Sequence, residues 1–128
     1  MPLVRISLHS GQSPEYKLQL GDCVHRALVE TMNAPADDRF QVITDHDAAG
    51  LIYDPHYLGI DRTDGLIIIQ VTLNSGRTVE MKEAFYARVA SLLKDELKVR
   101  PEDVFISLIE VSKENWSFGN GEAQYAPK

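Results

Sequence analysis

The chain has 128 residues, 44% of them hydrophobic, which suits one domain with a substantial core. Its formal charge of −6 excludes a protein that binds nucleic acid by general electrostatic attraction. One cysteine excludes an internal disulfide framework, and no apolar run is long enough to span a bilayer. There is no signal peptide, so we expect a cytoplasmic protein that binds neither nucleic acid nor membranes.

The chain begins with a Met-Pro pair, and its alternating apolar residues predict a strand over Pro2–Leu8. Proline is a small residue, after which the initiator methionine is usually removed, and removal would leave Pro2 with a free secondary amine. An amine fixed in a sheet can act as a general acid, a general base or a nucleophile. The alternative is a strand that merely starts with proline, a position that proline tolerates.

A helix and a second strand follow. Ser13 is the expected N-cap of the helix, and Pro14 suits the first helical turn. The segment 33–35 ends the helix, because its proline cannot continue it. A strand is expected over Arg39–Thr44. The order strand, helix, strand predicts a right-handed β-α-β unit with parallel strands.

A connector rich in Asp, Gly and Pro, Asp45–Asp64, separates this unit from a second one, and Leu51–Tyr53 within it is a candidate short strand. The second unit is predicted from strands at Gly65–Leu73 and Val104–Val111. Its helix has Thr78 as N-cap and ends before the proline of the segment 99–101.

The two units are an internal repeat at an offset of 65 residues, without gaps. Residues 6–13 match residues 71–78, and both helices carry apolar residues at the same five places. The expected fold is a single α+β domain, with pseudo-repeats at about 2–46 and 65–111. Its four-stranded sheet has two helices on one face, and a hairpin tail at 112–128 follows.

The tail has the strong turn pair Asn120-Gly121, with aromatic residues before and after it. No helix is left to cover the second face of the sheet. Because monomers rarely expose large apolar patches, we expect that face to be buried by oligomerisation.

These features together resemble the tautomerase superfamily, and more narrowly its malonate semialdehyde decarboxylase group. The resemblance covers essentially the whole chain. It rests on the Met-Pro start, Ala36-Asp37-Asp38-Arg39-Phe40-Gln41, Asn74-Ser75-Gly76-Arg77-Thr78 and Trp116-Ser117-Phe118-Gly119. It implies homotrimers with the sheets facing inward around a barrel, and an amino-terminal proline that is catalytic.

Carried over to this chain, the resemblance implies three catalytic residues: Pro2 as acid or base, Asp38 as its carboxylate neighbour, and Arg77 as the group that binds the substrate carboxylate. It also implies a pocket wall made of Trp116, Phe118 and Tyr125. The chain departs from the decarboxylase pattern at Ser75, where the group has a second arginine.

The residues themselves leave alternatives open. Arg77 suits bidentate carboxylate recognition, but a solvated loop arginine would also fit. Asp38 could be a turn cap, and the three aromatic side chains could be core or trimer contacts. The four histidines have no metal-ligand spacing, so no metal site is expected.

The leading hypothesis is a cofactor-free decarboxylase of a small 3-oxo acid such as malonate semialdehyde. Protonated Pro2 would stabilise the enolate that forms as carbon dioxide leaves. The alternatives are a keto-enol tautomerase or hydratase of a small oxo-acid, and a non-catalytic trimeric binding protein.

Overall fold

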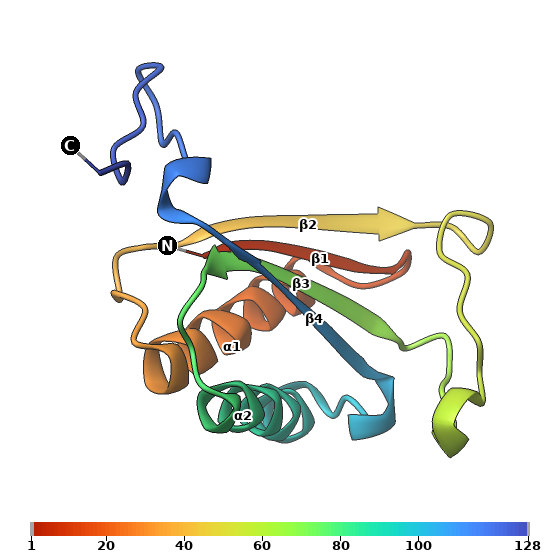
Figure 1. The fold of residues 1–128 in the computed structure, drawn as a ribbon. Coiled ribbons are helices and arrows are strands. Elements are labelled where there is room, and N and C mark those ends of the chain that lie inside the picture. The colour runs from red at the N-terminus through yellow and green to blue at the C-terminus, as the bar shows by residue number, and fades with distance from the viewer. Residues whose placement is uncertain (1, 128) are drawn as a thin grey trace.

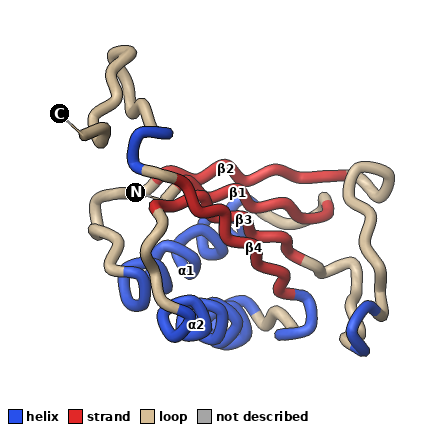
Figure 2. Tube along the Cα trace, in the orientation of Figure 1, coloured by secondary structure: helices blue, strands red, loops and turns tan. Residues whose placement is uncertain are grey.

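A computed structural model of the chain describes residues 2–127 (Figures 1 and 2). The structure contains four strands and two long helices, with single 3-10 turns at residues 57–59, 101–103 and 113–115. In chain order the strands and helices are β1 (Leu3–His9), α1 (Pro14–Met32), β2 (Phe40–His46), β3 (Ile67–Asn74), α2 (Val79–Leu97) and β4 (Val104–Val111).

The strands form one sheet in the order β2-β1-β3-β4. β1 is parallel to β2, β3 is parallel to β4, and β1 and β3 are antiparallel at the centre. Figure 1 shows both helices against the same face of the sheet. The predicted α+β fold with two β-α-β units is confirmed.

The repeat is visible in individual contacts. Ser13 and Thr78 cap their helices as predicted, each accepting a hydrogen bond from the main-chain N–H three residues later. The Lys17–Asp45 ion pair of the first unit has the Lys82–Glu110 pair as its equivalent in the second, at the 65-residue offset. The two halves therefore share their packing as well as their topology.

The core lies between the sheet and the helices. The inward residues of β1 and β3 are fully buried, and they pack on the apolar faces of α1 and α2. Cys23 belongs to this core, and burial raises its pKa to about 11, which favours the unreactive thiol at neutral pH. No helix among residues 2–127 is long and apolar enough to cross a membrane.

The other face of the sheet is open. Phe40 is 54% exposed and Phe105 is 46% exposed, and these residues occupy equivalent places in β2 and β4. Val42 and Ile109 are also exposed large apolar residues of these two strands. This face carries no helix or loop layer in Figure 1, as the sequence predicts.

The structure differs from the sequence prediction in two loop segments. The short strand expected at Leu51–Tyr53 is wrong, because this segment has no strand pairing and its Leu51 carbonyl accepts a hydrogen bond from the His9 ring instead. In the tail, Asn120 and Gly121 form a turn with positive φ at both residues. Residues 112–127 contain no strand, so the turn closes without a paired hairpin.

Candidate active site

The strand register brings separate parts of the sequence to one end of the sheet. Leu3 pairs with Phe40 on β2 and with Thr72 on β3, so β1 and β2 begin where β3 ends. Asn74 pairs with Val111, so β4 ends there too, and the tail starts at the same edge. Figure 1 shows the N-terminus, the arrowhead of β3 and the tail gathered at this end.

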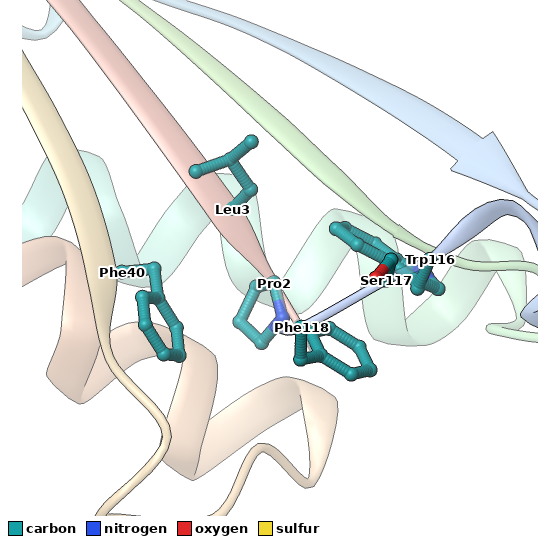
Figure 3. A pocket seen from close by; sticks show the side chains of 6 residues that line it. All are labelled: Pro2, Leu3, Phe40, Trp116, Ser117 and Phe118. Atoms are coloured by element: carbon teal, nitrogen blue, oxygen red, sulfur yellow. The ribbon is translucent and has the colours of Figure 1, made fainter. Parts of the chain in front are cut away.

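A cavity of about 230 Å³ lies at this end, and Pro2 is one of its walls (Figure 3). The cavity is lined by Pro2, Leu3, Phe40, Trp116, Ser117 and Phe118. Pro2 is buried. A small molecule in this cavity would therefore meet the Pro2 ring in mainly apolar surroundings, where electrostatic interactions are stronger than in water.

The aromatic wall is built within the tail. The rings of Trp116 and Phe118 are stacked with centroids 5.4 Å apart, and Tyr125 meets Phe118 edge-on at 4.8 Å. The side-chain amide of Gln124 closes the tail by accepting from the Phe118 N–H and donating to the Gly119 carbonyl. Tyr125 therefore contacts the wall through Phe118, and it does not line the cavity, unlike the wall residue that the resemblance implied.

Asp38 lies in the turn before β2, two residues ahead of Phe40. Its side chain is buried, with the residue only 8% exposed, and burial raises the pKa of its carboxyl above the ordinary value. A buried carboxylate is costly unless a cation or hydrogen bonds compensate it. Burial and the raised pKa keep Asp38 a candidate carboxyl of this site.

Arg77 occupies a different place from the one its sequence position suggests. It precedes α2, yet its guanidinium donates to the Met32 carbonyl at the end of α1 (3.2 Å) and to the Asn74 carbonyl at the end of β3 (2.9 Å). The positive charge of Arg77 therefore interacts favourably with the dipole of α1 at the C-terminus of that helix. Two of the five N–H donors of an arginine are used in these bonds, and Arg77 does not line the cavity.

The structure also shows site residues that sequence reasoning left without a role. Phe40 and Ser117 line the cavity, and the indole N–H of Trp116 donates to Asn74 Oδ1 at 2.8 Å. The predicted parallel pairing could have revealed Phe40, because it places the starts of the first two strands side by side. The Asn74 contact had no such signal, since it joins residues that are 42 positions apart.

The second unit has no equivalent set of groups. Ile67 takes the place of Pro2 at the 65-residue offset, and Gln12 takes the place of Arg77. The mate of Asp38 is Asp103, whose carboxylate accepts from the Thr63 N–H at 2.7 Å and the Thr63 hydroxyl at 2.6 Å. That aspartate anchors the connector. The second unit does have a cavity of about 250 Å³ lined by Ile52, Tyr53, Ile68 and Phe105 among others, but Pro2 and Arg77 lie at the first cavity's end of the sheet.

Comparisons with known proteins agree on one family. A family model described as "Tautomerase enzyme" matches residues 38–119, and a second model with the same description matches residues 2–60. The "Probable tautomerase YusQ" of Bacillus subtilis (strain 168) is 48% identical over 124 residues, which cover 97% of this chain and 98% of that protein.

Solved structures with the same fold include two malonate semialdehyde decarboxylases. FG41 malonate semialdehyde decarboxylase inhibited by 3-bromopropiolate is 41% identical, with a TM-score of 0.89 over 96% of this chain and 93% of that one. A second, described as having decarboxylase and hydratase activities, is 29% identical, with a TM-score of 0.90 over 96% and 95%. A fused 4-OT symmetric trimer, 24% identical over 98% and 99% with a TM-score of 0.78, shares the fold.

Proposed function

Because this chain belongs to the tautomerase superfamily, we propose that it is a cofactor-free decarboxylase of a small 3-oxo acid such as malonate semialdehyde. The observation that carries the proposal is the position of Pro2, buried in the wall of an apolar cavity at the sheet end where Asp38 is also buried. The 41% identity to a malonate semialdehyde decarboxylase over nearly the whole chain supports the choice of substrate class.

The proposed mechanism needs Pro2 as a free amine, so Met1 must be removed first. Arg77 lies outside the cavity lining but is tied through Asn74 to the Trp116 wall, and in this mechanism it binds the substrate carboxylate at the edge of the cavity. It does so with the N–H groups that Met32 and Asn74 leave unused. The bond between the carboxylate carbon and C2 then breaks, and its electron pair passes into an enolate. Carbon dioxide leaves, and the Pro2 ammonium donates a hydrogen bond to the enolate oxygen. A proton from solvent water then adds to C2 and completes the formation of acetaldehyde, leaving hydroxide that the solvent neutralises.

The same site favours a second function if Pro2 is neutral. An apolar wall disfavours the ammonium form, and a neutral amine could remove an α-proton and so catalyse keto-enol tautomerisation. The names of the curated relatives, probable tautomerases, favour this alternative. Ser75 is compatible with either function, because its hydroxyl and its N–H both donate to the Val111 carbonyl and so close the end of β4.

The direct test is to offer both substrate classes to protein whose intact mass shows that Met1 is absent. Malonate semialdehyde and phenylenolpyruvate would be followed separately by NMR. We expect acetaldehyde to accumulate far above the uncatalysed rate. Rapid ketonisation of phenylenolpyruvate with malonate semialdehyde unchanged would instead establish the tautomerase.

A pH–rate profile of Asp38→Asn should show which protonation state of Pro2 is active. An α-amino group titrates at about 7.7–8.0, and a neighbouring carboxylate raises that pKa by favouring the cation. Removing the carboxylate should therefore move the high-pH limb of kcat/KM to lower pH. Burial raises the pKa of Asp38, so the two profiles should converge at acid pH, where the wild-type carboxyl is also neutral. A high-pH limb that stays in place would show that Asp38 does not control the Pro2 proton.

We also propose that the protein is a homotrimer that buries the open sheet face. Light scattering should then give about three times the 14.4 kDa chain mass. Ile109→Lys places a charge on this face and should lower the measured mass, whereas Leu18→Lys, on the exposed side of α1, should not. A monodisperse wild-type monomer would contradict the assembly.

A further inference from the structure

We propose that Asn74 is a positioning residue of this site, which fixes the indole of Trp116 in the cavity wall while its main-chain carbonyl orients Arg77. The proposal rests on the proposed function for its kinetic consequences. Its geometry is independent of that function: Asn74 Oδ1 accepts from Trp116 Nε1 at 2.8 Å, and the Asn74 carbonyl accepts from Arg77 Nη1 at 2.9 Å.

Asn74 is well placed for this role because its own main chain is fixed. It is the last residue of β3, and it forms the final pair of the β3–β4 ladder with Val111. The next residue, Ser75, is bound to the same Val111 carbonyl through its N–H and its hydroxyl. The side chain of Asn74 therefore starts from a rigid position at the edge of the site.

The bond to Trp116 is the attachment of the aromatic wall to the sheet. Among residues 2–127, it is the hydrogen bond that joins the segment 116–127 to the rest of the chain, and the other hydrogen bonds of that segment are internal. An indole N–H can only donate, so the wall requires an acceptor at this position. Because Phe118 stacks on Trp116, the bond controls the placement of both rings.

The internal repeat allows the role of Asn74 to be compared with that of its equivalent in the first unit. The equivalent of Asn74 in the first unit is His9, and the equivalent of Trp116 is Leu51, both at the 65-residue offset. His9 holds its partner through the Leu51 carbonyl, at 2.9 Å from its Nε2. Both units thus use the end of the first strand to anchor the segment after the second. In the second unit the anchored group is a side chain that lines the cavity.

The test uses the fact that Trp116 is the only tryptophan of the chain, so its emission reports the wall directly. Asn74→Leu keeps a similar volume without an acceptor, and Asn74→Asp keeps the acceptor. We expect red-shifted emission and easier acrylamide quenching for Asn74→Leu, and near wild-type values for Asn74→Asp. His9→Ala, the matched control, should lower thermal stability and leave the emission unchanged.

Kinetics then test whether Asn74 acts through Trp116. A displacement of about 1 Å in a site can cost on the order of 10²-fold in rate, so Asn74→Leu should lower kcat/KM by about 10- to 100-fold. In a Trp116→Phe background the same change should cost less than about threefold, because the bond is already absent. Equal losses in both backgrounds, or unchanged emission in Asn74→Leu, would overturn the proposal. A wild-type protein without turnover would refute the proposed function, while emission and quenching would still decide the role of Asn74.

Discussion

Pro2→Ala should lower kcat/KM by roughly 10²- to 10⁴-fold, the usual contribution of a positioned acid or base, with the fold retained. Alanine provides a primary amine that is less rigid and differs in basicity from the ring nitrogen of proline. Pro2 lines the cavity immediately before β1, so the substitution changes the reacting amine without changing a strand residue. The measurement is the initial rate with malonate semialdehyde, on protein of verified mass.

A matched control changes the Pro2 nitrogen and leaves the ring in place. A chain with one additional residue before Pro2 has an amide there, which neither donates nor accepts a proton at neutral pH. We expect that protein to be as inactive as Pro2→Ala, with the same far-UV circular dichroism as the wild type. Activity within about twofold of wild type in either protein would exclude Pro2 as the acid or base.

Arg77→Ala should reduce the turnover of carboxylate substrates by about 10- to 150-fold. This range follows from the roughly 1.5–3 kcal/mol that a hydrogen bond to a charged group contributes. The guanidinium is held by Met32 and Asn74 on neighbouring elements, so it is preorganised and loses little freedom when it binds an anion. The comparison to make is between a 3-oxo acid and its methyl ester.

The structural part of the Arg77 effect can be separated from the functional part. Loss of the bonds to Met32 and Asn74 should also lower the unfolding free energy, by roughly 0.5–1.5 kcal/mol for each bond. Gln12→Ala changes the equivalent position in the first unit, where no cation is present, and should leave turnover unchanged. If the ester suffers as much as the acid in Arg77→Ala, then Arg77 does not bind the carboxylate.

The sequence alone determined the architecture. The 65-residue repeat carried the helix caps Ser13 and Thr78, the apolar helix faces and the parallel pairing of the strands in each unit. These agree with the structure because each depends on contacts within one β-α-β unit. The predicted parallel pairing also implies that the first two strands start side by side, as Leu3 and Phe40 do in the structure. Local signals of this kind occur in both units, so each unit supports the interpretation of the other.

Contacts between distant segments were decided only by the tertiary structure. Leu51–Tyr53 has the composition of a strand, but no sheet edge reaches it, and His9 binds its main chain instead. Arg77 precedes α2 in the sequence, yet its guanidinium is bound to the Met32 carbonyl at the C-terminus of α1. Tyr125 supports Phe118 outside the cavity, and Trp116 depends on Asn74. Each of these outcomes depends on which side chains come into contact at the end of the sheet. The spacing of residues along the chain does not determine those contacts.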